Sequence, residues 1–166
     1  MDDEGRWITI DGRRWRATDP QIPETFRHEL VDELMSARRE VGRARRTGAV
    51  AEERDARTRV HHAKVALGER GEPWWEAPSA EGREARLRAA TLALADHRSP
   101  GRTICPSDVA RAVGGDAWRS LMEPVREVVR DLARSGEVEI LQRGEVLDPD
   151  GGWRGPIRIR RRVEPG

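Results

Sequence analysis

The stretch from Pro106 to Gly136 constrains the fold most, because it reads as two helices separated by a Gly-Gly turn. Ser107 is a favourable N-cap for a first helix over Asp108–Val113, and Gly114-Gly115 ends that helix. A longer helix follows. Two helices joined by a short glycine turn are typical of a helix-turn-helix.

The longer helix has one apolar side, and its start is open to two interpretations. The apolar residues recur at helical spacing: Val125, Val128, Val129 and Leu132. Pro124 lies early in this pattern and removes a backbone donor. Either the helix is kinked at Pro124, or a short turn over 117–122 precedes a main helix that begins near Glu123.

Strand signals flank this region. We expect an antiparallel hairpin of Val138–Gln142 and Pro156–Arg160, since both segments alternate between apolar and polar residues. A short strand over 103–105 and a helix over about 82–97, with Leu87 and Leu94 facing inward, precede the two helices. This order predicts a C-terminal winged helix-turn-helix.

The N-terminal residues predict a second hairpin. Asp11-Gly12 separates two alternating segments, and this dipeptide favours a two-residue turn in which both residues have positive φ. The register places Ile10 opposite Arg13 and Ile8 opposite Trp15. An isolated hairpin is marginal in water, so we expect the face with Ile8, Ile10 and Trp15 to pack on a helix.

Two amphipathic helices should follow, on either side of Gly48. The first stripe comprises Phe26, Leu30, Leu34, Ala37, Val41 and Ala44, and the second comprises Ala56, Val60, Ala63 and Leu67. The helices can form an antiparallel αα-hairpin. Alternatively, such a pair can associate with a second copy as a small bundle.

The predicted boundary between the two halves contains adjacent tryptophans. Gly71, two prolines and Ser79 stop the flanking helices. Trp74 and Trp75 either dock onto one domain and fix the junction, or act as a partner-binding anchor. The predicted fold class is therefore α+β and mostly helical, with a β-hairpin and αα-hairpin over residues 5–72, a linker over 73–79 and a winged helix over 80–162.

Composition limits the function classes. The formal net charge is +1, so the chain has no strong basic excess, and nucleic-acid binding would have to use a local patch. Cys105 is the only cysteine, which excludes an internal disulfide. No apolar run approaches the ~20 residues of a membrane span, and the N-terminus is acidic. We expect no membrane association and a cytoplasmic location.

Arginines on the longer helix and the predicted wing are the candidate binding site. Arg119, Arg126 and Arg130 share one helix face, and Arg158 and Arg160 alternate outward from the last strand. Arg143 and Arg154 lie in the hairpin loop. A recognition helix beside a basic wing can place Arg on groove edges and phosphates of double-stranded DNA.

Acidic residues on the same helix favour another interpretation. Glu123, Glu127 and Asp131 are spaced for ordinary i,i+3 or i,i+4 pairing and would repel phosphate. Trp153 near the loop tip can stack on a base, although folding back on its own hairpin is the interpretation we favour. The alternative function is a protein–protein adaptor, with the helical hairpin as a partner or self-association surface.

The residues give little support to catalysis or to a cofactor. Cys105 and His97 are a conceivable nucleophile and base, but no orienting third group is apparent and Cys105 falls in a predicted core strand. One cysteine and four scattered histidines give no metal-ligand spacing. We therefore expect a non-enzymatic protein without metal or cofactor.

Two resemblances cover most of the chain, and both occur in actinobacterial sequences. The segments Thr103–Arg111, Trp118-Arg119 and Gly155–Arg158, with Met122, are similar to a small bacterial domain family of unknown function, which implies a winged-helix fold. The segments Trp7–Arg16 and His61–Trp75 resemble proteins labelled "biopolymer transporter Tol". Neither resemblance implies an established activity.

Overall fold

The computed structural model describes residue 3 and residues 5–163, and the fold is α+β and mostly helical, as predicted. The N-terminal elements are β1 (Trp7–Ile10), β2 (Arg13–Arg16), α1 (Glu24–Thr47) and α2 (Val50–Ala66). The remaining elements are α3 (Ala80–Arg98), α4 (Pro106–Gly114), the 3-10 helix η1 (Gly115–Leu121), α5 (Met122–Arg134), β3 (Val138–Gln142), β4 (Glu145–Val146) and β5 (Arg158–Arg161).

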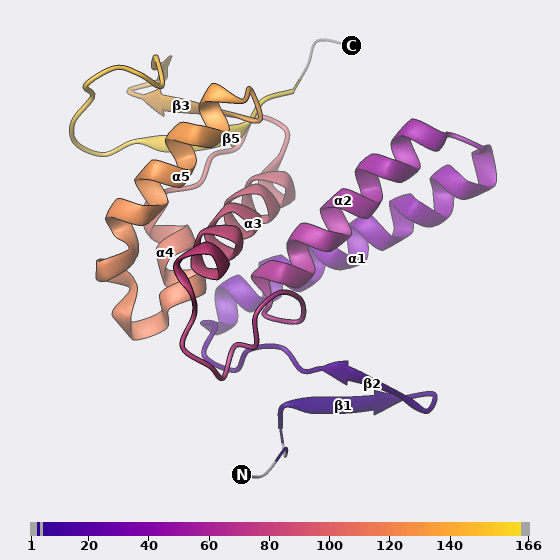
Figure 1. Ribbon diagram of the computed structural model, residues 1–166. Coiled ribbons are helices and arrows are strands. Elements are labelled where there is room, and N and C mark those ends of the chain that lie inside the picture. The colour runs from indigo at the N-terminus through magenta and orange to yellow at the C-terminus, as the bar shows by residue number, and fades with distance from the viewer. Residues whose placement is uncertain (1–2, 4, 164–166) are drawn as a thin grey trace.

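Helix α3 lies at the centre of the molecule. It contacts α1 and α2 on one side and α4, α5 and β5 on the other (Figure 1). Its middle is buried all round, from Leu87 through Ala95 apart from the half-buried Arg88, whereas the sequence predicts one inward face. The cause is the alanine content of α3, because a helix of small residues can be approached from every direction.

One continuous core joins the N-terminal helices to the C-terminal strands. Leu30 of α1 and Leu67 at the end of α2 belong to the same buried cluster as Leu87, Val129 and Ile159. The predicted inward stripe of α5 is buried, with Val125, Val129 and Leu132 at 0% exposure. The predicted linker 73–79 is a loop on the surface of this assembly.

The start of α5 agrees with one of the two predicted alternatives, and the start of α4 differs from the prediction. The 3-10 helix η1 precedes α5, which begins at Met122, so the alternative of a short turn before the main helix is confirmed. Pro124 lies in the first turn, where its missing donor costs little. The expected N-cap Ser107 is wrong by two residues: Cys105 is the N-cap of α4, and the Asp108 carboxylate accepts its backbone N–H at 2.9 Å.

The C-terminal strands form a sheet of order β4-β3-β5. Val138 pairs with Arg161 and Ile140 with Ile159, so β5 begins two residues later than expected. Ile104 forms an isolated bridge with Ile159, with N–H···O distances of 2.8 and 2.9 Å in the two directions. The short strand β4 does not appear in the sequence-based prediction.

The N-terminal hairpin has the predicted register but a different packing. Ile8 pairs with Trp15 and Ile10 with Arg13, and Asp11 and Gly12 both have positive φ. The expected burial of Ile8 and Ile10 is wrong, because they remain 47% and 54% exposed. On that predicted face, Trp15 contacts Lys64 of α2, whose Nζ lies 4.9 Å from the ring centroid. The opposite face is anchored through Trp7, whose ring packs edge-on against Trp75 with 5.8 Å between the ring centroids.

Helices α1 and α2 form the predicted antiparallel αα-hairpin. Gly48 ends α1 in the left-handed conformation, with φ of 70°. Alanines Ala37, Ala44, Ala56 and Ala63 are buried, which allows the two helices to approach closely. The hairpin extends away from the body as an arm (Figure 1).

Candidate nucleic-acid interface

The predicted arginine row on α5 is partly covered by the protein's own loop. Arg126 and Arg130 are half-buried beneath the loop over 147–157, and both guanidinium groups lie over the ring of Trp153, at 4.8 and 4.3 Å from its centroid. Arg130 donates to the carbonyl oxygens of Pro149 and, at 3.1 Å, Gly151. The two arginines therefore hold the protein's own loop.

Trp153 folds back on its hairpin, the interpretation favoured from the sequence. Its indole N–H donates to the carbonyl of Asp148 at 3.2 Å, and the Asp148 carboxylate accepts the backbone N–H of Asp150 at 2.8 Å. The loop thus has its own internal turn, and the tryptophan ring joins that turn to α5.

The exposed side of α5 is acidic. Glu123, Glu127 and Asp131 are all exposed and follow each other every fourth residue. Arg134 pairs with Asp131 at 3.1 Å and with Asp150 at 2.7 Å, and the hydrogen bond that it donates to the Asp150 carboxylate raises the pKa of Arg134. A phosphate backbone next to this side of α5 would meet carboxylates first.

Four of the predicted arginines are exposed: Arg119, Arg143, Arg154 and, on β5, Arg158. Arg143 and Arg154 lie in the loops of the C-terminal hairpin, and within residues 5–163 their side chains make no hydrogen bond or ion pair. Arg143 has φ of 52°, beside Gly144 in the β3–β4 turn. Arg119 lies over one side of Trp118 at 4.5 Å, with Arg111 also over that ring at 4.6 Å.

The two arginines of β5 have structural partners. Arg158 donates to the Thr103 hydroxyl at 2.8 Å and contacts the sulfur of Cys105, which joins β5 to the segment before α4. Arg160 pairs with Glu139 across the strand pair at 3.5 Å. Residues 106–162 contain eleven arginines and ten acidic residues, so this whole region has a net charge of only +1.

The tryptophans of the 73–79 loop dock onto the N-terminal hairpin. Trp74 donates its indole N–H to the carbonyl of Ala17 at 3.0 Å. Trp75 packs edge-on against Trp74, with 5.2 Å between the ring centroids. Arg6 and Arg16 lie over the Trp75 ring. Two half-buried rings, together with the satisfied N–H of Trp74, are typical of a packing role.

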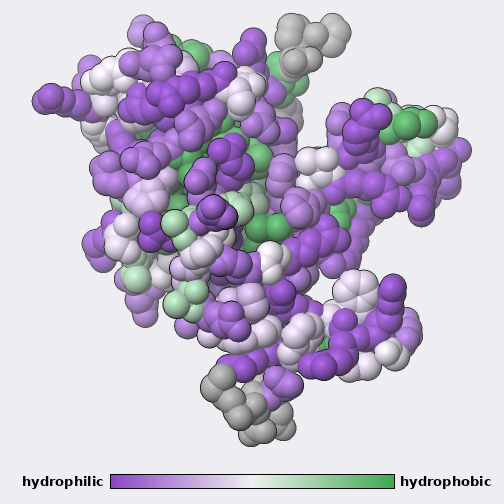
Figure 2. Space-filling view, in the orientation of Figure 1, coloured by the Kyte–Doolittle hydropathy of each residue, from purple (hydrophilic) through white to green (hydrophobic). Residues whose placement is uncertain are grey.

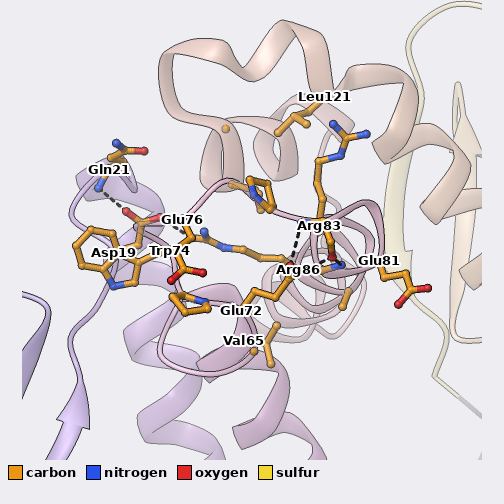
Figure 3. A pocket seen from close by; sticks show the side chains of 18 of the residues that line it. Asp19, Gln21, Val65, Glu72, Trp74, Glu76, Glu81, Arg83, Arg86 and Leu121 are labelled. Carbon is orange, nitrogen blue, oxygen red and sulfur yellow. Dashed lines mark hydrogen bonds and ion pairs between the residues drawn. The ribbon is translucent and has the colours of Figure 1, made fainter.

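A cleft of about 720 Å³ lies beside this junction, and the sequence does not reveal it. The buried Asp19 accepts a hydrogen bond from Arg86 of α3 at 2.9 Å, while Arg83 points toward Leu121 (Figure 3). Trp74 forms one wall. The only sequence signal was the Trp-Trp pair, because the lining comes from segments up to a hundred residues apart.

A second charged cluster joins α1 and α2 to α3 and β5. Glu33 is 1% exposed and accepts a hydrogen bond from Arg59, while Asp96 accepts one from Arg161 at 2.9 Å. Desolvation by burial raises the pKa of both carboxyls. Among the described residues, Oε2 of Glu33 has no hydrogen-bond partner.

Among the described residues, the side chains considered for catalysis and for metal binding have other neighbours. Cys105 is half-buried and contacts Arg158, whereas His97 lies 3.5 Å from Glu29 of α1, so the conceivable nucleophile and base have different neighbours. Across the described residues, no group of three His, Cys, Asp or Glu side chains is placed to hold a metal ion. The described helices also include none with the length and apolarity to cross a bilayer.

Comparison with known protein families gives a match over the C-terminal half. Residues 84–162 match the family described as "Protein of unknown function (DUF3253)", which confirms the resemblance predicted for the C-terminal half. No curated protein matches the chain. The resemblance of the N-terminal half to Tol-labelled proteins stays a prediction.

Proposed function

We propose that residues 84–162 form a winged-helix module that binds double-stranded DNA without catalysing a reaction. The observation that supports it best is the order of elements: helix α3, the Ile104 bridge to β5, α4, α5, and then the β3–β5 hairpin with its long loop beside α5. A helix pair followed by a hairpin is an arrangement that can contact a groove and the adjacent backbone. This function would place the protein in the cytoplasm.

The contacts assigned to DNA are the arginines that remain free. Arg143 and Arg154 on the hairpin loops and Arg119 at the η1 corner are exposed. Arg126 and Arg130 serve the loop in the unbound protein, and they reach DNA only if the loop moves. Initial contact is therefore through the wing, not through α5.

Fluorescence anisotropy with a labelled 30-base-pair duplex tests the proposal. We expect binding that weakens steeply with salt, and at least tenfold weaker binding for the double variant Arg143→Gln/Arg154→Gln, since each lost phosphate contact removes counterion release. The matched control is Arg70→Gln/Arg83→Gln, which removes the same charge from exposed positions elsewhere. Equal binding by the two double variants would contradict the proposal.

A protein–protein adaptor is the second candidate, and one observation favours it. Ile8 and Ile10 form an exposed apolar edge on the N-terminal hairpin, and the acids of α5 face outward. An adaptor of this kind would show no affinity for the duplex even at low salt. Its binding to a protein partner would be lost in Ile8→Ser/Ile10→Ser and kept in Arg143→Gln/Arg154→Gln.

A further inference from the structure

The positive charge of this protein is concentrated at the end of the α1–α2 arm. Residues 38–59 contain eight arginines and four acids, a net charge of +4, while the whole chain has a net charge of +1. The rest of the chain is therefore acidic overall. The region that sequence patterns assign to nucleic acid, residues 106–162, has only +1.

Ion pairs at the arm separate two groups of arginines. Arg43 bridges Glu40 and Glu52, and Arg57 pairs with Glu53 at 3.0 Å. These pairs use three of the four acids and tie α1 to α2. Arg45 also pairs with Glu53, at 3.6 Å, and Arg59 pairs with the buried Glu33, so four of the eight arginines are left without a carboxylate partner within residues 5–163.

That second group consists of four exposed arginines, and within residues 5–163 none of them forms an ion pair or a side-chain hydrogen bond: Arg38, Arg39, Arg46 and Arg54. Arg39 and Arg46 are seven residues apart, which is about two turns, so they share one side of α1. The outer end of the arm projects from the body and is mostly hydrophilic on the face shown (Figure 2). Free guanidinium groups on a projecting rod are accessible to a large polyanion.

We propose that the tip of the arm, defined as Arg38, Arg39, Arg46 and Arg54, is a second DNA-binding surface that contacts backbone phosphates. Arginine pairs with phosphate through two parallel N–H donors, and a row of such contacts needs no particular base sequence. The inference rests on the proposed function, since it assumes the same DNA. It assigns most of the sequence-independent affinity to the arm, not to the C-terminal hairpin.

The test is the salt dependence of duplex binding by the full chain. We expect the quadruple variant of the tip to bind at least tenfold more weakly at about 0.15 M salt. The slope of log K against log salt is negative, and its magnitude should decrease by up to about 3.6. The substitutions are Arg38→Gln, Arg39→Gln, Arg46→Gln and Arg54→Gln. Circular dichroism checks that the arm stays helical, which these solvent-facing changes should permit.

Two further variants separate charge from position. The same four positions changed to Lys keep the charge and should keep most of the affinity. A control with four glutamines at Arg13, Arg27, Arg70 and Arg83 removes equal charge elsewhere and should keep the wild-type slope. An equal loss in this control would overturn the inference, because net charge alone would then explain the effect.

Comparison with Arg143→Gln/Arg154→Gln distinguishes the two proposals. A loss in both the tip and the hairpin variants supports both. A loss in the hairpin variant alone overturns the arm site and leaves the proposed function standing. A loss in the tip variant alone supports the arm site and overturns the assignment to the C-terminal module. A wild-type protein that does not bind the duplex at low salt overturns both.

Discussion

The guanidinium carbon of Arg130 lies 4.3 Å from the ring centroid of Trp153, and the neighbouring carbonyls of Pro149 and Gly151 accept its hydrogen bonds. The helix side that sequence patterns offer to DNA thus binds the protein's own loop. The loop is held by aromatic and charged groups together, and this makes its attachment measurable.

Removing the Trp153 ring should release the loop. Trp153→Ala is expected to lower the free energy of unfolding by about 1–2 kcal/mol, since two cation–π contacts are lost, each worth about 0.5–1 kcal/mol. Urea denaturation measures this loss, and hydrogen exchange should show faster opening of residues 147–157. Trp153→Phe keeps a ring over both arginines and should lose less. If both variants are as stable as wild type, the loop is not held by Trp153.

The Asp19–Arg86 pair should contribute far more to stability than a surface pair on the same helix. Arg86→Met leaves the carboxylate of Asp19, 4% exposed, without its cation, and breaking a buried pair costs about 3–5 kcal/mol. The exposed pair Arg88–Glu84 is the matched control, and Arg88→Met should cost under about 0.5 kcal/mol. If denaturant titration gives the same loss of unfolding free energy for Arg86→Met and Arg88→Met, Asp19 is solvated and the prediction is wrong.

Glu33 should make the protein less stable as pH rises. Burial raises its folded-state pKa above the ordinary 4.5, so the folded state holds more protons than the unfolded state above that pH. The free energy of unfolding therefore falls as pH increases through the interval between the two pKa values. Glu33→Gln removes this dependence, and its stability relative to wild type should increase from pH 4.5 to pH 7. A constant difference over that range would contradict the assignment.

Gly82 should tolerate alanine only when Glu72 is absent. A Cβ at Gly82 would lie 1.7 Å from Oε2 of Glu72, whose carboxylate accepts the N–H and hydroxyl of Ser79 at the start of α3. Gly82→Ala must displace that carboxylate, and we expect a net loss of stability. In a Glu72→Ala background the same change should be stabilising by about 0.5–1 kcal/mol, the usual helix preference. If Gly82→Ala changes the free energy of unfolding in the same direction in both backgrounds, the double-mutant cycle contradicts this prediction.

Local chemistry made much of the backbone predictable. Asp11-Gly12 gave the turn and register of β1 and β2, and the spacing of Val125, Val129 and Leu132 gave the buried side of α5. These signals act within a few residues. They do not depend on where the rest of the chain lies.

The contacts that decide the candidate site were not predictable in the same way. Arginine has an apolar stem and a charged head, so a stripe of arginines looks the same whether it faces water or holds a loop. Trp153 reaches α5 from about 25 residues away, and Trp74 reaches Ala17 from 57 residues away. No short-range pattern encodes either partner.

The central position of α3 has a consequence for proteins that match the same family model. The family match begins at residue 84, inside α3, yet this helix is buried on the side of α1 and α2 as well as on the side of α4 and α5. A relative that shares only residues 84–162 must therefore shield the first of these sides with some other segment, or replace the alanines there with polar residues.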